Sequence, residues 1–228
     1  MVEIGPGRGA LTAHLLPRSK RVIAIEVDPV LIQYLRSKFR GVEPIDIVEN
    51  DILRTDLSAW GGPLVVAGNL PYYITSPIID KVLSLGSLLS HAVFLVQKEV
   101  AERLAASPGS RDFGYLSVQT QLLAEVEVLF PVPAAAFRPP PKVDSAVVQL
   151  TPRAQLAFAE SREFLKFAAA AFHQKRKTLR NNLLGRYDKA KLDALPETKK
   201  RAEQLGLNEL IALWRTLDQS QPGATQEE

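Results

Sequence analysis

The chain has 228 residues, of which 46% are hydrophobic and 23% charged, and its formal net charge is +3. This composition is typical of a folded globular protein, and the length allows one domain of ordinary size plus a small second one. The sequence has no cysteine, no apolar run long enough for a membrane span and no signal-peptide pattern. Disulfides and thiolate metal sites are therefore excluded, the three scattered histidines do not favour a metal site, and we expect a cytoplasmic protein.

A glycine-rich segment follows the first strand-like run. Residues 1–4 lead directly into Gly5-Pro6-Gly7-Arg8-Gly9, and a helical pattern begins at Ala10. A glycine turn between a strand and a helix lets backbone approach a ligand closely, and the positive helix end favours anionic groups. The GxGxG spacing differs from the GxGxxG of dinucleotide folds. We expect a binding loop here, although a tight turn without a ligand would use the same residues.

The next two predicted strands end in acidic residues. The strand at 21–28 ends in Glu26 and Asp28, and Pro29 opens a helix at the favoured first position. A carboxylate at this place can bind ribose hydroxyls, a role that we assign to Glu26, whereas Asp28 is the better candidate for a helix cap. Asp51 follows a third strand at 44–49 and either binds an adenine amino group or shapes a turn.

The most informative stretch is residues 67–73, which we expect to form a loop after a buried strand at 63–66. Pro71 stiffens this turn and keeps Leu70 out of the helical region, which leaves the Leu70 carbonyl free of any helix ladder. With the Asn69 amide and the Tyr72 ring, it can hold an exocyclic amine and stack on its base. The alternative is a turn with a packed tyrosine.

Strands and helices alternate up to residue 150. We predict helices at 77–85, 98–104 and 113–123, and strands at 92–96, 124–130 and 146–150. The proline-dense segment 131–142 is predicted to be extended surface chain without helix. Phe137, which it carries, is either a stacking platform for a base or a hydrophobic anchor for the segment.

We place a domain boundary at Thr151-Pro152-Arg153, because helical patterning alone follows it. The predicted divisions are an α/β domain at 1–153, a helical domain at 154–218 and a disordered tail at 219–228. Helices are expected at 160–172, 175–184 and 208–217, the last capped by Asn208. Residues 173–201 hold ten Lys or Arg and three Asp or Glu, a local charge of +7 against −4 elsewhere. This asymmetry favours a polyanion partner, although a solvated lysine-rich face has the same composition.

Six motifs in order resemble the KsgA family of S-adenosylmethionine-dependent dimethyltransferases that act on small-subunit ribosomal RNA. The motifs are Glu3 to Gly9, Glu26, Asn50-Asp51, Asn69 to Tyr72, the Phe-Arg-Pro-Pro-Pro-Lys-Val-Asp-Ser run from Phe137, and Phe172 to Asn181. The resemblance implies an α/β class I methyltransferase fold, Rossmann-like, with a seven-stranded sheet, an antiparallel last hairpin and a small helical domain. It also implies a monomeric enzyme that methylates N6 of two adjacent adenosines near the 3′ end of 16S rRNA in ribosome biogenesis.

The resemblance assigns roles to residues in three groups. The S-adenosylmethionine-binding residues are Glu3, Gly5, Gly7, Gly9, Glu26, Asp51 and Asn69. The residues on the target adenine are Asn69, Leu70, Pro71, Tyr72 and Phe137. The RNA-binding residues are Arg138, Lys142, Lys175, Arg176, Lys177 and Arg180.

The resemblance has two departures. Family members begin some tens of residues earlier, with a basic segment and a Gln/Phe-bearing motif over the cofactor, whereas this chain starts inside the first strand. We therefore expect a first strand of about three residues and a lower affinity for the cofactor. Tyr73 stands where many relatives have asparagine.

Three other functions are open to a chain with these motifs. The first is an enzyme of the related Erm type, which methylates 23S rRNA. The second is a non-catalytic RNA-binding or ribosome-assembly factor, and the third, which is less favoured, is a dinucleotide-dependent oxidoreductase. The motif at 172–181 favours the small-subunit enzymes over the Erm type, and the GxGxG spacing disfavours the oxidoreductase.

Overall fold

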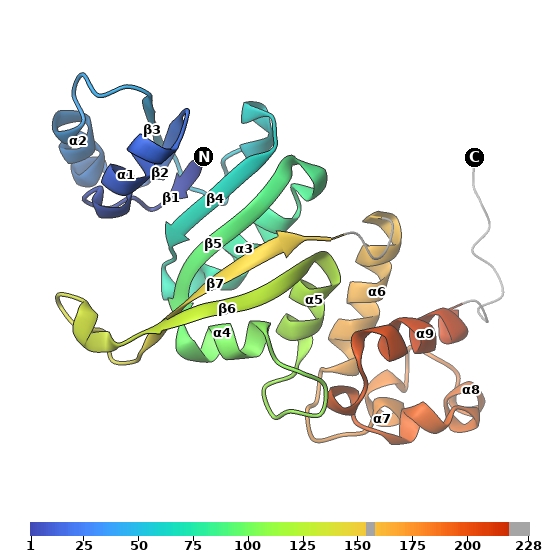
Figure 1. Ribbon diagram of the computed structural model, residues 1–228. Helices are drawn as coiled ribbons and strands as arrows, with labels where there is room; N and C mark the ends of the chain where they lie inside the picture. Colours follow the sequence, from blue (N-terminus) through green and yellow to red (C-terminus); the bar gives the residue numbers. More distant parts are fainter. Residues whose placement is uncertain (154–157, 219–228) are drawn as a thin grey trace, which may run out of the picture. The chain divides into compact units, whose positions relative to one another are not determined.

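The computed structural model describes residues 1–153 and 158–218. Within them one sheet has the strand order β3-β2-β1-β4-β5-β7-β6 (Figure 1). The strands are β1 Val2–Ile4, β2 Val22–Glu26, β3 Ile45–Glu49, β4 Leu64–Asn69, β5 Leu89–Gln97, β6 Ala124–Val132 and β7 Ser145–Pro152. Strands β1 to β5 are parallel, and β7 is antiparallel to both β5 and β6. The predicted seven-stranded sheet with an antiparallel last hairpin is confirmed.

Helices occur in both compact units into which the described chain divides. They are α1 Ala10–Leu15, α2 Pro29–Lys38, α3 Thr75–Leu83, α4 Lys98–Leu104, α5 Tyr115–Leu123, α6 Phe158–Ala171, α7 Leu179–Leu183, α8 Lys189–Ala194 and α9 Leu207–Asp218. The first unit comprises residues 1–102 and 123–153, and the second comprises 103–122 and 158–218. In the part of the chain that is described, no helix is long and apolar enough to cross a membrane.

This division differs from the predicted one, in which a boundary at 153 places residues 103–122 in the first domain. These residues group with the later helices because Phe113, which is fully buried, packs edge-on against Phe172 with ring centroids 6.1 Å apart. The Gly109 N–H also donates to the Glu203 carbonyl. Both contacts join residues far apart in sequence, so no local pattern reports them. The predicted tail at 219–228 lies outside the described residues.

Strand β4 is longer than predicted. Residues 67–69 were expected to lie in a loop, but they pair with Val93, Phe94 and Leu95 of β5. Gly68 permits this because a Cβ there would lie 2.6 Å from the Ile4 carbonyl oxygen of β1. The chain leaves the sheet only at Leu70 and Pro71, and Asn69 is therefore held on a strand by backbone pairing.

The segment between β6 and β7 is also only partly as predicted. Strand β6 continues to Val132, and residues 134–136 form one turn of 3₁₀ helix where extended chain was expected. The Ala136 N–H closes this turn on the Pro133 carbonyl, and the Asp144 carboxylate accepts from the Ala134 N–H at its start. In Figure 1 this yellow-green segment extends beyond the end of the sheet.

In the second unit, the predicted basic helix at 175–184 is only partly confirmed, because a helix occupies Leu179–Leu183 alone. Residues 174–177 form a turn, with the Lys177 N–H on the Gln174 carbonyl, and α7 starts only after Thr178. The Thr178 hydroxyl accepts from the Asn181 N–H and caps α7, so the consecutive cations lie ahead of the helix.

The predicted Asn208 cap is wrong, because Asn208 lies inside α9. The Glu209 carboxylate instead accepts from the Gly206 N–H just before this helix. Helix α8, which was not predicted, is capped by Asp188. The core of this unit is aromatic: Phe164 packs edge-on against Trp214, with ring centroids 5.8 Å apart.

Candidate functional site

The predicted site residues of the first unit gather at one edge of the sheet. Because β1 to β4 are parallel, their carboxyl ends share an edge, which brings together Gly5, Glu26, Asp51 and Asn69. The strand order reverses between β1 and β4, where one neighbour continues to β2 and the other to β5. In open α/β sheets, ligands bind outside the carboxyl ends at such a switch point.

A cavity of about 290 Å³ opens at this edge. Its lining residues are Ile4, Gly5, Ile25, Glu26, Val27, Asn50, Asp51, Ile52, Leu53, Pro71, Tyr73, Ile74 and Ile78. Sequence reasoning missed the apolar walls, although Val27 and Ile52 directly follow the two acids. Apolar walls with a few polar groups at one side suit a flat heterocycle with a sugar.

The predicted cofactor-binding residues fall into two groups. Gly5, Glu26 and Asp51 line the cavity, whereas Glu3, Gly7, Gly9 and Asn69 do not. Gly5 has φ +64°, a left-handed conformation that favours glycine, and its N–H donates to the Ile25 carbonyl. A Cβ on Gly9 would lie 2.6 Å from the Phe39 ring, so this glycine is required for packing between α1 and α2.

Glu26 ties the glycine loop to the end of β2. The residue is 7% exposed, and its carboxylate accepts from the N–H groups of Gly7 at 3.1 Å, Val27 at 2.9 Å and Asp28 at 3.1 Å. A carboxylate has about four lone-pair sites, so roughly one is left for a ligand. The interpretation of Asp28 as a helix cap is confirmed, because it accepts from Val30 and Leu31.

Asp51 both shapes a turn and faces the cavity. Its Oδ1 accepts from the Leu53 N–H at 2.8 Å, as in the turn-forming alternative. Within residues 1–153 and 158–218, its Oδ2 has no hydrogen-bond partner. The turn is braced by the Lys81 ammonium, which donates to the Leu53 carbonyl at 3.2 Å. One carboxylate oxygen is thus structural and the other is available to a ligand.

The stretch from Asn69 to Tyr72 presents two oxygen acceptors beside the cavity. The Asn69 side chain is exposed, and neither its amide nor the Leu70 carbonyl bonds to another described residue. The Leu70 side chain is buried, and its N–H donates to Leu95 of β5 at 3.1 Å. The Tyr72 hydroxyl hydrogen bonds to Ser145 at 2.9 Å, which holds the ring to β7.

Phe137 reaches the same edge from the β6–β7 segment. Val132 pairs with Ser145, and Ser145 pairs with Gln97, the last residue of β5. The segment therefore leaves the sheet at the carboxyl end of β5, next to the end of β4. Phe137 is half-buried, whereas Arg138 and Lys142 are exposed.

The four cations predicted in the second unit differ in their partners. The Lys175 ammonium donates to the Arg111 carbonyl, and Arg180 forms an ion pair with Asp193. Arg176 and Lys177 are exposed, and their side chains contact no partner among the residues that the structure describes.

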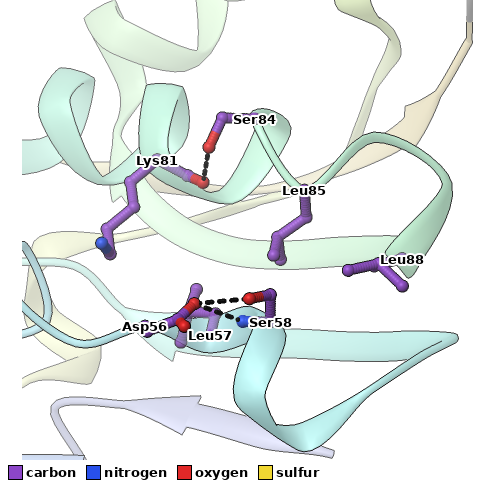
Figure 2. Close-up of a pocket in the computed structure, with 7 residues that line it drawn as sticks. All are labelled: Asp56, Leu57, Ser58, Lys81, Ser84, Leu85 and Leu88. Atoms are coloured by element: carbon purple, nitrogen blue, oxygen red, sulfur yellow. Dashed lines mark hydrogen bonds between the residues drawn. The ribbon is translucent and has the colours of Figure 1, made fainter.

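A second hollow of about 260 Å³ lies elsewhere on the first unit (Figure 2). Figure 2 shows Asp56 bonded to Ser58 and the Ser84 hydroxyl bonded to the Lys81 carbonyl. Its residues at 56–58 and 84–88 come just before β4 and β5 and therefore lie toward the opposite edge of the sheet. These polar groups cap and close short turns, and we assign no ligand to them.

Glu3 provides a pH-dependent prediction. The residue is 2% exposed, and burial raises the pKa of its carboxyl above the ordinary 4.5, an effect that the nearby Thr12 hydroxyl and N–H partly offset. The folded protein then binds more protons between the two pKa values, so its free energy of unfolding falls as the pH rises above about 4.5. We expect Glu3→Gln to be more stable than the parent at pH 7.5, with the difference vanishing near pH 4.

Denaturant unfolding measured from pH 4 to 7.5 checks this prediction. Glu127→Gln, which changes an exposed carboxylate on β6, is the matched control and should follow the parent throughout. A constant difference in stability between Glu3→Gln and the parent at every pH would contradict it.

Comparison with known proteins identifies the family of this chain. Residues 1–214 match the family model described as "Ribosomal RNA adenine dimethylase". The chain is 45% identical to "Ribosomal RNA small subunit methyltransferase A" of Acidobacterium capsulatum over 229 residues, 96% of this chain and 81% of that protein. The protein of the same name from Saccharophagus degradans is 44% identical over 223 residues, 95% of this chain and 83% of that protein.

Two solved structures share the fold over nearly the whole chain. A dimethyladenosine transferase from Plasmodium falciparum has a TM-score of 0.77 and 30% identity, covering 93% of this chain and 87% of that one. The 23S rRNA methyltransferase ErmE has a TM-score of 0.70 and 29% identity, covering 95% and 90%. The sheet is thus that of a class I methyltransferase, and the chain belongs to the ribosomal RNA adenine dimethylase family.

Proposed function

We propose that this dimethylase transfers methyl groups to N6 of two adjacent adenosines near the 3′ end of 16S rRNA, acting as a cytoplasmic monomer on the small ribosomal subunit. The observation that carries the proposal is a pair of acceptors at the end of a fixed strand, the Asn69 amide oxygen and the Leu70 carbonyl, neither of which has a partner among the described residues. The similarity to relatives named for the small subunit, at 45% and 44% identity, favours this RNA over the 23S RNA named for ErmE at 29%.

The cavity fits S-adenosylmethionine. Its apolar walls suit the adenine ring, the free Oδ2 of Asp51 can accept from the adenine amino group, and Glu26 has room for one ribose hydroxyl. Gly5 leaves backbone open at the cavity wall, and we assign the methionine end to the loop from Gly5 to Gly9, with Glu3 beneath it. When bound, S-adenosylmethionine supplies an electrophilic methyl group on a sulfonium.

The chain's own residues have to make a poor nucleophile react. The adenine N6 lone pair is delocalised into the ring, and two acceptors for the N6 hydrogens can turn it out of conjugation toward the methyl donor. Asn69 and Leu70 supply these acceptors, Pro71 fixes their backbone, and the Tyr72 and Phe137 rings stack on the base. Orientation and preorganised dipoles then carry catalysis, and no side chain acts as a base, so the proton that N6 loses with each methyl transfer passes to water.

Asn69→Ala tests this mechanism. The variant lacks one of the two acceptors, so its methyl-transfer rate should fall by about 100- to 1000-fold, the usual cost of losing one preorganised polar group. Its affinity for S-adenosylmethionine, measured by calorimetry, should change little. Asn208→Ala, on an exposed position of α9, is the control. Dimethylation at the full rate by Asn69→Ala would refute the mechanism.

We assign RNA phosphate contacts to the exposed cations of the two RNA-facing segments. These are Arg138 and Lys142 beside Phe137, and Arg176 and Lys177 in the turn before α7. Lys175 and Arg180 are in the same basic region, but their side chains are bonded to Arg111 and Asp193. We therefore assign Lys175 to holding the turn and Arg180 to joining α7 to α8.

Charge reversal at Arg176 and Lys177 should weaken RNA binding and flatten its salt dependence. Each lost phosphate contact lowers the slope of log K against log salt by about 0.7 to 0.9. The matched control reverses Lys20 and Arg40, two exposed cations of the first unit outside the site. RNA binding measured between 50 and 200 mM salt decides the point, and an unchanged slope would count against the assignment.

A further inference from the structure

Two adjacent residues at the start of β7 hold both aromatic residues proposed for the target adenine. Ser145 hydrogen bonds to the Tyr72 hydroxyl at 2.9 Å. Asp144 accepts from the Ala134 N–H at 2.9 Å, and the turn that starts there ends with the Phe137 N–H on the Ala134 carbonyl at 3.1 Å. Tyr72 and Phe137 are far apart in sequence, yet each connects to one dipeptide whose Cα atoms are about 3.8 Å apart.

The dipeptide is itself fixed by the sheet. Ser145 is fully buried and pairs with Gln97 on one side and Val132 on the other. The Asp144 carbonyl accepts from the Lys98 N–H at 3.0 Å, where β5 passes into α4. Any displacement of these two residues would break backbone pairing, so they are a rigid reference for the side chains that they contact.

The chemistry of Ser145 points to this contact. A hydroxyl fully buried in a strand costs free energy unless it is hydrogen bonded, and alanine would fill the same space without that cost. The Ser145 hydroxyl hydrogen bonds to the hydroxyl of Tyr72, whose ring can rotate about its side-chain bonds. The hydrogen bond at the far end of the ring removes that freedom and sets the plane on which a base would stack.

We propose that Asp144 and Ser145 are positioning residues that set the orientation of Tyr72 and the placement of Phe137 on the target adenine. This inference rests on the proposed function, because it needs an adenine between or beside these rings. Neither residue contacts the reacting atoms. Ser145 acts through the Tyr72 ring, and Asp144 acts through the turn at 134–136.

A double-mutant cycle tests the positioning role of Ser145. Ser145→Ala and Tyr72→Phe remove the same hydrogen bond from opposite ends, and each should lower kcat/KM for small ribosomal subunits by about five- to tenfold, the size of one hydrogen bond. The double variant should be no slower than either single one, because the bond can be lost only once. Affinity for S-adenosylmethionine should stay within about twofold. Thr151→Ala, exposed on the same strand, is the control.

A matched pair of variants tests the positioning role of Asp144. Asp144→Asn keeps an oxygen that can accept from the Ala134 N–H and should retain the parent rate, whereas Asp144→Ala should lose about fivefold. RNA with 2-aminopurine in place of the target adenosine reports stacking, because its fluorescence is quenched between aromatic rings. Quenching should be weaker with Ser145→Ala and Asp144→Ala than with the parent.

The outcomes of these experiments distinguish a failure of this inference from a failure of the proposed function on which it rests. An inactive parent that neither binds S-adenosylmethionine nor quenches 2-aminopurine overturns both. An active parent with unchanged Ser145→Ala and Tyr72→Phe variants, or with losses that multiply in the double variant, overturns the positioning role alone. If Ser145→Ala fails to fold, Tyr72→Phe leaves β7 intact, and parental activity and quenching in that variant are then enough to reject the role.

Discussion

The pairing of β4 between β1 and β5 is the constraint on which the site depends. Gly68 lies so close to the Ile4 carbonyl that a Cβ would come within 2.6 Å of it, and the next residue, Asn69, still pairs with Leu95. The glycine loop after β1 and the acceptors after β4 are therefore set side by side by backbone hydrogen bonds. A Cβ on Gly5 would lie 3.9 Å from the Asn69 carbonyl oxygen. The loop proposed for the cofactor and the acceptors proposed for the target adenine therefore share one rigid frame, which suits a reaction that depends on alignment.

Several polar groups at this edge hold the local structure and keep acceptor capacity for a ligand. Glu26 holds the glycine loop through the Gly7 N–H and has about one lone pair left, and Asp51 uses one oxygen for its turn. Asp51 therefore shapes its turn and still has one carboxylate oxygen that a ligand can use, so its two predicted roles, turn-forming and ligand-binding, do not exclude each other. Such shared use fixes the donors and acceptors before a ligand arrives, so less ordering is required on binding.

Local sequence signals predicted the strands, the glycine loop and the Asp28 cap, because each depends on a few neighbouring residues. The antiparallel last hairpin was implied by the family resemblance. Contacts between distant residues were not predictable. The extension of β4 through Asn69 depends on Ile4 and Phe94, and residues 103–122 join the second unit through Phe113 and Phe172. The consecutive cations from Lys175 resembled a helix by composition, but the Thr178 cap starts α7 after them. The Ser145 contact with Tyr72 joins residues 73 positions apart, which periodicity cannot report.

The central claim is that this chain dimethylates adenosines of small-subunit RNA with acceptors at Asn69 and Leu70. The most direct measurement incubates the purified chain with S-adenosylmethionine carrying a labelled methyl group and with small ribosomal subunits, then identifies the nucleosides by mass spectrometry. The account predicts labelled N6,N6-dimethyladenosine at two adjacent positions near the 3′ end of 16S rRNA, and none in 23S rRNA offered in parallel. RNA binding without any methyl transfer, or label confined to 23S rRNA, would contradict it.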